Sequence, residues 1–194
     1  MSLPRIALIP VFGIASLFAY GCSDPPPPTP RGGFDVQWLD SPPAECQLNT
    51  HRAQVGSPTA TDPGEKISDG QNGASVECTV SGSGTYLVKG RIQQDLNILA
   101  VTVSSLSSSA SRAAPAKGSV TFRSKELQAG SVNSDADEPC DFWFPDERPD
   151  DQRVSGGKAW LVFSCPKMNH LQGSVCALGE SYVLFENCDL GEEE

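Results

Sequence analysis

Short segments in which apolar and polar residues alternate recur along this chain, and they constrain its fold more than any other feature. A period of two places successive side chains on opposite faces of a β-strand. No segment keeps the 3.6-residue apolar period of a packed helix, so we expect very little helix. The sequence therefore predicts an all-β protein, with strands at residues 34–39, 51–55, 74–80, 85–93, 97–106, 118–124, 140–144, 158–165 and 180–188.

Turn residues separate these segments. Asn72-Gly73 favours positive φ angles just before one predicted strand, and residues 81–84, Ser-Gly-Ser-Gly, join two strands as a hairpin. Residues 40–69 are rich in Pro and Gly, and residues 131–138 read as an acidic turn. Many short strands joined by turns and long loops predict a single antiparallel β-sandwich-like domain.

The N-terminus has the three parts of a secretory signal. Residues 1–5 carry one positive side chain, residues 6–18 are almost wholly apolar, and small residues at positions 19 and 21 precede Cys22. The apolar run is shorter than the roughly 20 residues that a membrane-spanning helix needs. We therefore expect residues 1–21 to be a signal peptide that is removed by cleavage just before Cys22.

The stretch Ala19-Tyr20-Gly21-Cys22 resembles the lipobox of bacterial lipoproteins, although that family usually carries Leu where Ala19 stands and a small residue where Tyr20 stands. The resemblance implies that a lipid is attached to the Cys22 thiol. Two or more acyl chains would anchor the protein stably to a membrane. Ordinary secretion, with the same cleavage and no lipid, is the alternative.

Residues 22–33 read as a lipidated Cys followed by a Pro-rich tether, and residues 34–194 as the β-domain. The prolines favour polyproline II, which rises about 3.1 Å per residue, so the tether could hold the domain roughly 30 Å from the bilayer. In lipoproteins of enteric bacteria, Asp directly after the lipidated Cys retains the protein at the inner membrane, but Ser23 stands there. The resemblance therefore implies an envelope location, in the outer membrane rather than the inner.

The chain has 7 cysteines, which leaves an even number once Cys22 is committed to lipid. Paired cysteines are typical of an oxidising compartment. The spacings contain no Cys-x-x-Cys and the chain has only 2 His, which argues against a zinc site. Six cysteines permit 15 pairings, among which the sequence does not decide; our choice is Cys46–Cys78 and Cys165–Cys176, which close local loops, together with Cys140–Cys188. The sequence thus predicts three disulfides among Cys46, Cys78, Cys140, Cys165, Cys176 and Cys188.

Three motifs extend over most of the mature chain: Asp69-Gly70 with Gly73-Ala74-Ser75-Val76-Glu77-Cys78, then Gly157-Lys158-Ala159-Trp160 to Cys165-Pro166, and Phe185-Glu186-Asn187-Cys188. Together they resemble a group of uncharacterised six-cysteine lipoproteins from myxobacteria. The motifs consist of Gly, Cys and core aromatic residues, which specify a scaffold. The resemblance therefore implies a lipoprotein fold and brings no established activity.

The best candidate for a metal site is the acidic segment from Asn133 to Glu138. Its alternating oxygens are similar to the start of a calcium loop, but Glu138 stands where the tight turn needs Gly. An irregular, weak calcium site would use Asp135 and Asp137, with Asp146 as a further ligand. A solvated acidic loop is the simpler reading, and we expect no cofactor.

Catalytic motifs are sparse. There is no Gly-x-Ser-x-Gly elbow, but the members of a Ser-His-acid triad need not be close in sequence. His51 and His170 are the available bases, and Ser and Asp are plentiful. A secreted envelope hydrolase therefore remains an alternative, which a cleft converging on either His with a Ser and an acid would favour.

Trp143 gives the alternative of carbohydrate binding. It stands between Phe142 and Phe144, so at least one ring of the three faces away from its neighbours. An exposed Trp143 would stack on a sugar, whereas a buried one would be part of the core. Burial of this ring would remove the carbohydrate alternative.

Charge limits the partners. The formal net charge is -10, which opposes binding to nucleic acid and to anionic membrane surfaces.

Together with the lipobox resemblance and the sparse catalytic motifs, this charge leads us to expect a non-enzymatic, lipid-anchored surface or periplasmic interaction module. It would reach the membrane through its N-terminal lipid and bind an envelope protein or polysaccharide.

Overall fold

The computed structural model describes residues 26–41, 45–46, 48–127, 130–146, 153–170 and 173–191. Within these ranges the chain forms twelve strands and one short 3-10 turn, η1 (Gln71–Gly73), which confirms the predicted all-β, antiparallel domain. The strands are β1 (Arg31–Leu39), β2 (His51–Val55), β3 (Ile67–Ser68), β4 (Ser75–Ser83), β5 (Thr85–Gln94), β6 (Asn97–Ser107), β7 (Ala116–Arg123), β8 (Val132–Ser134), β9 (Cys140–Trp143), β10 (Val154–Ser155), β11 (Lys158–Asn169) and β12 (Val175–Glu186).

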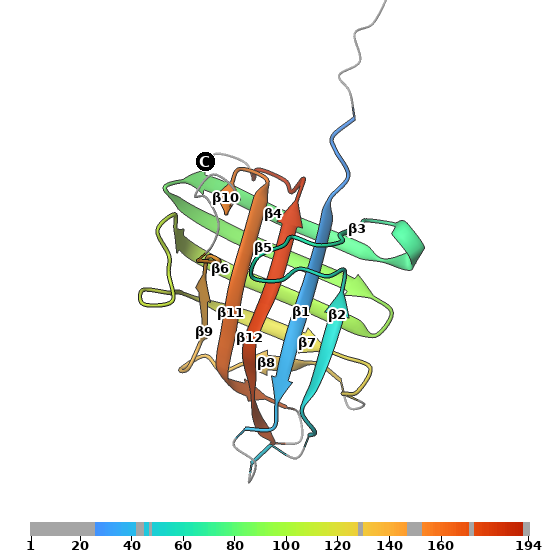
Figure 1. Ribbon diagram of the computed structural model, residues 1–194, viewed down its shortest axis with the longest axis vertical. Helices are drawn as coiled ribbons and strands as arrows, with labels where there is room; N and C mark the ends of the chain where they lie inside the picture. The colour runs from blue at the N-terminus through green and yellow to red at the C-terminus, as the bar shows by residue number, and fades with distance from the viewer. Residues whose placement is uncertain are drawn as a thin grey trace, which may run out of the picture.

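These strands belong to one hydrogen-bonded sheet that folds over on itself into two layers (Figure 1). One layer contains β2, β1, β12 and β11, and the other contains β7, β6, β5 and β4, whose strands cross the first set at a large angle. The short strands β8 and β9 join the layers, because each pairs with both β11 and β7. The predicted sandwich-like arrangement is therefore built from a single folded sheet.

The core lies between the two layers and follows the alternation in the sequence. Val76 and Val80 of β4 are buried, with Glu77 exposed between them. Two glycines let the layers approach closely. A Cβ built on Gly90 of β5 would lie 2.4 Å from the ring of Phe185 in β12, and one on Gly32 would lie 2.8 Å from the Ile92 side chain. Both positions therefore require the smallest residue.

Three disulfides join described residues, and they pair the predicted cysteines differently: Cys46 with Cys176, Cys78 with Cys188, and Cys140 with Cys165. The three predicted pairs are wrong, because the bonds follow neighbours in space rather than short loops. Cys46, which follows β1, meets Cys176 of β12 because β1 and β12 are adjacent strands. Cys165 meets Cys140 because β11 pairs with β9 at Ser164 and Asp141.

Several strand boundaries differ from the prediction. β1 begins at Arg31, so residues 31–33 belong to the sheet rather than to the tether. The acidic turn contains β8, whose single buried side chain is Val132. β11 and β12 extend to Asn169 and back to Val175, forming one long hairpin. These segments contain Gly, Ser and Asn, which give no alternation to read.

The edge of β4 is covered by the segment that follows β12. The backbone N–H of Val80 donates to the Asp189 carbonyl at 2.9 Å, and the N–H of Asp189 donates to the Cys78 carbonyl at 2.9 Å. The N–H of Gly157 donates to the Val80 carbonyl at 3.0 Å. The disulfide Cys78–Cys188 lies beside these bonds. Covering an edge in this way removes a template for pairing with other chains.

Candidate functional site

A Ser–His pair connects the two layers at one end of the domain. His51 begins β2, and Ser124 directly follows β7. Nε2 of His51 lies 2.8 Å from Oγ of Ser124, and Nδ1 lies 2.9 Å from the carbonyl oxygen of Asn49. A carbonyl only accepts, so Nδ1 carries the proton in neutral His51 and Nε2 accepts the Ser124 hydroxyl proton. This is the proton arrangement that a His general base needs beside a Ser nucleophile.

The surroundings of the pair do not give substrate access to Ser124. Its exposed fraction is 1%, and the hollow of about 200 Å³ beside it is lined by Leu48, Asn49, His51, Glu126 and Leu127 instead. Trp38 stacks on His51 with ring centroids 5.9 Å apart. The arrangement therefore serves as a polar link between β2 and β7, and Asn49 takes the place that an acid holds in a triad.

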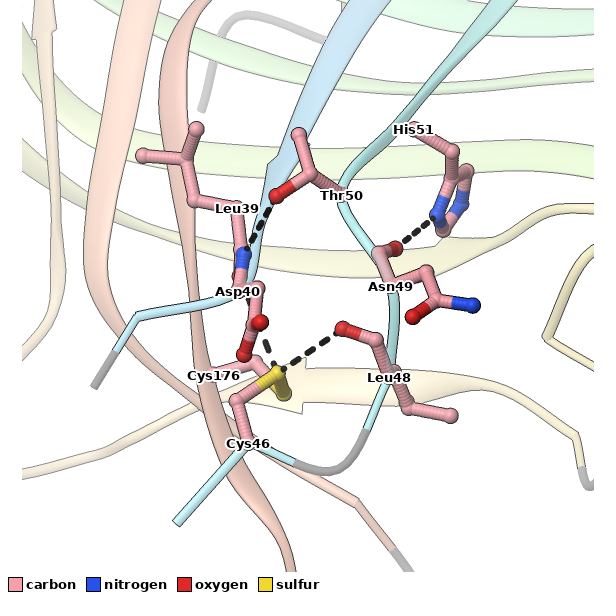
Figure 2. The surroundings of a disulfide bond; sticks show 8 residues. All are labelled: Leu39, Asp40, Cys46, Leu48, Asn49, Thr50, His51 and Cys176. Carbon is pink, nitrogen blue, oxygen red and sulfur yellow. Dashed lines mark hydrogen bonds between the residues drawn. A yellow bond between two sulfur atoms is a disulfide. The ribbon is translucent and has the colours of Figure 1, made fainter. Parts of the chain in front are cut away.

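A disulfide holds the loop that precedes His51, as Figure 2 shows. The N–H of Asp40 donates to Oγ1 of Thr50 at 3.0 Å, which ties the end of β1 to the residue before β2. Sγ of Cys46 lies 3.5 Å from the Leu48 carbonyl oxygen, a contact rather than a hydrogen bond because a disulfide sulfur has no proton. These links fix the backbone that presents the Asn49 carbonyl to His51.

The second candidate base, His170, lies in the turn between β11 and β12. It is 7% exposed, and its backbone N–H donates to the Ser174 carbonyl at 3.0 Å. The turn is therefore anchored at its first residue. Sequence reasoning named both His but had no signal for Ser124, which is one of many serines and lies 73 positions from His51.

The calcium candidate Asp135 is engaged by donors from the protein itself. Its Oδ2 accepts from Nδ2 of Asn169 at 2.8 Å and lies 3.1 Å from Nζ of Lys167. Its Oδ1 accepts from the N–H groups of Asp137 and Glu138. Among the described residues no group of three His, Cys, Asp or Glu side chains is arranged to hold a metal. The geometry favours a solvated acidic turn at Asp135 and Asp137, with an ammonium group beside the carboxylate.

We expect the Asp135 carboxyl to titrate far below the usual 3.8, because hydrogen bonds from Asn169, then from Lys167 and the Asp137 backbone, lower its pKa. A lowered pKa contributes stability at neutral pH, and that contribution is lost as pH falls through the folded-state pKa. Carbon-detected NMR titration measures the midpoint, which Lys167→Met should raise. Lys125→Met, which removes an exposed ammonium near Glu126, is the control. A midpoint at 3.8, or one moved by added Ca²⁺, would contradict this expectation.

Trp143 is buried rather than presented to solvent. Its exposed fraction is 4%, and the guanidinium of Arg112 lies over the ring at 4.9 Å from the centroid. Arg112 also donates to Glu180, which accepts from the hydroxyl of Tyr182 at 2.7 Å. Burial, then the bond to Glu180, raises the pKa of Tyr182 to about 12. The ring is therefore part of a packed cluster, which argues against carbohydrate stacking on Trp143.

A groove of about 630 Å³ lies on the outer face of β4, β5 and β6. Across the sheet Glu77 pairs with Arg91, and Thr79 pairs with Lys89. Small side chains on β6, Ala100 and Thr102, form the floor. These residues are the outward positions of predicted strands, but no motif marked them as a binding surface. The groove offers both signs of charge and the hydroxyl groups of Thr79 and Thr102.

Comparison of the chain with protein-family models, with curated proteins and with solved structures finds no match in any of the three. Within the residues that the structure describes, no helix is long and apolar enough to cross a membrane. The fold and geometry above therefore define an all-β, disulfide-linked domain.

Proposed function

We propose that this chain is a lipid-anchored lipoprotein of the bacterial cell envelope that acts as a non-enzymatic interaction module. The pairing of the other six cysteines carries the proposal, because it leaves Cys22 without a cysteine partner in this chain. The resemblance of residues 19–22 to a lipobox supplies a role for that thiol. Ser23 after Cys22 favours the outer membrane, and disulfides fit an oxidising compartment.

The groove on β4, β5 and β6 is the surface on which such a module would bind its partner. It is open, and the Cys78–Cys188 disulfide and the covered edge of β4 hold its first strand in shape. Its hydroxyl groups and its charges of both signs suit an envelope protein or polysaccharide rather than nucleic acid. Binding at a preformed sheet face needs little rearrangement of the backbone.

Mass spectrometry of the mature protein extracted from membranes tests the anchor. We expect a lipid-mass increment on the N-terminal peptide that begins at Cys22, and a gain of two protons for each disulfide upon reduction. Cys22→Ser should abolish the increment and release the protein from the membrane fraction. An unmodified Cys22 in membrane-derived protein would contradict the anchoring proposal and favour soluble secretion.

A secreted hydrolase is the second candidate, and the geometry of Ser124 and His51 is the observation that favours it. Because Ser124 is 1% exposed, we expect a fluorophosphonate probe to leave it unlabelled. We also expect Ser124→Ala to lower the free energy of unfolding by about 1 kcal/mol through loss of one hydrogen bond. Ser181→Ala removes a buried hydroxyl that makes two hydrogen bonds, so it is the comparison and should cost more than Ser124→Ala. A probe adduct mapped to Ser124 would overturn the non-enzymatic proposal.

A further inference from the structure

The last residues of the tether are fixed to the domain. The carbonyl of Thr29 accepts a hydrogen bond from Nδ2 of Asn187 at 3.0 Å, and the carbonyl of Pro30 accepts one from the N–H of Asp69 at 2.9 Å. Arg31 then pairs with Glu186 at 2.8 Å. The tether therefore meets the domain at a defined place, beside the end of β12.

A hollow of about 500 Å³ marks this end of the domain. Pro27 and Pro28 form one wall, and residues 156–158 and 186–190 form the rest. Leu190, at the rim, is 61% exposed. Residues 26–30 continue from β1 away from the body of the domain (Figure 1). The first hydrogen bond between the tether and the domain is at Thr29, about seven residues after Cys22, which shortens the free part of the tether.

We infer that the end of the domain formed by residues 156–158 and 187–190, the tether end, faces the lipid surface and lies close to it. This inference rests on the proposed anchoring at Cys22. Seven residues span at most about 25 Å when fully extended. The tether end therefore stays within that distance of the acylated residue, and the roughly 30 Å separation expected from the whole Pro-rich segment is not available to the domain.

Electrostatic attraction is not needed for this orientation. Lys158 of the tether end and its neighbours Arg31 and Lys66 lie 3.8, 2.8 and 3.3 Å from the Glu186 carboxylate, which offsets part of their positive charge. The covalent tether and its hydrogen bonds set the direction instead. The orientation should therefore persist on zwitterionic lipid and at high salt, where attraction between exposed charges is screened.

The opposite end carries the Ser124–His51 pair. His51 pairs with Trp38, which is seven residues along β1 from Arg31, or roughly 23 Å at the rise of a strand. Lys125, next to Ser124, is an exposed site in this region. The inference therefore predicts that Leu190 lies near the lipid and that Lys125 lies far from it.

Short-range quenching on vesicles tests the orientation. The mature chain, residues 22–194, is coupled through the Cys22 thiol to a maleimide lipid in phosphatidylcholine vesicles that contain a copper-chelating lipid. A fluorophore is carried on a non-natural residue at position 190 or at position 125. We expect at least twofold stronger quenching at position 190, unchanged in 0.5 M salt. Equal quenching, or stronger quenching at position 125, would overturn the inference.

Two variants test whether the hydrogen bond between Asn187 and Thr29 sets the orientation of the domain. Asn187→Gly introduces a residue that tolerates the positive φ of 58° but removes the hydrogen bond to Thr29. The difference in quenching between positions 190 and 125 should therefore shrink. Asp95→Gly, at φ 53° in the turn between β5 and β6, is the matched control and should leave it unchanged. An Asn187→Gly result identical to the control would show that the tether contact does not set the orientation. Chemical coupling makes this test independent of lipidation in cells.

Discussion

Replacing Cys78 and Cys188 together by Ala is expected to lower the free energy of unfolding by about 4–5 kcal/mol. The disulfide closes a loop of 110 residues, and the chain entropy that it removes from the unfolded state grows with loop length. It also holds Asp189 against β4, where that residue covers the strand edge. Urea unfolding of the oxidised variant, followed by fluorescence, measures the loss.

The disulfide Cys140–Cys165 provides the comparison. It closes only 25 residues, so replacing both of its cysteines by Ala should cost about 3.5 kcal/mol, less than the loss at Cys78–Cys188. The Cys78 and Cys188 variant should also aggregate faster, because the freed β4 edge exposes backbone donors and acceptors. A larger loss for the Cys140 and Cys165 variant would contradict the dependence on loop length.

Gly90→Ala is expected to lower the free energy of unfolding by about 3 kcal/mol, because the new methyl group has no room. Its Cβ would lie 2.4 and 2.5 Å from two ring atoms of Phe185, which is itself fully buried. Relief of such overpacking requires a shift of one layer against the other. Thermal and urea unfolding of the single variant measure the effect.

A double-mutant cycle with Phe185→Leu tests whether the Phe185 ring causes the loss of stability in Gly90→Ala. The smaller side chain should cost about 1 kcal/mol alone but should reduce the added cost of Gly90→Ala to below about 1 kcal/mol. Gly156→Ala is the control, since its nearest neighbour would be the mobile end of the Leu190 side chain at 3.1 Å. Additive losses in the double variant would show that Phe185 is not the obstacle.

The strands could be predicted from the sequence where apolar side chains alternate, as they do at Val76, Cys78 and Val80. That pattern is a local property of a sheet with one buried face. β8 has one apolar residue, Val132, and its pairing with β7 and β11 depends on the fold around it. Such a strand gives no signal of its own.

The disulfide pairs and the candidate site depended on which strands are neighbours. The preference for short loops misassigned Cys46 and Cys176, because the chain's first and last long strands lie side by side. Trp143 was the predicted ring for carbohydrate stacking, but it is buried and Arg112 from a distant loop covers it. Ser124 and His51 meet because the start of β2 lies beside the end of β7, and alternation along a single strand does not reveal that arrangement.

The pairing of β1 with β12 also sets an order of assembly. Arg31 lies opposite Glu186, so during synthesis β1 has, among the described strands, only β2 and β3 as lateral partners until nearly the whole chain has emerged. Both β1 and β11 obtain their shared neighbour at the same moment, when β12 arrives between them. Folding of the layer that contains β1, β12 and β11 must therefore be a late event. In a chain that stops before Val175, the apolar face of this layer would stay exposed to chaperones and proteases.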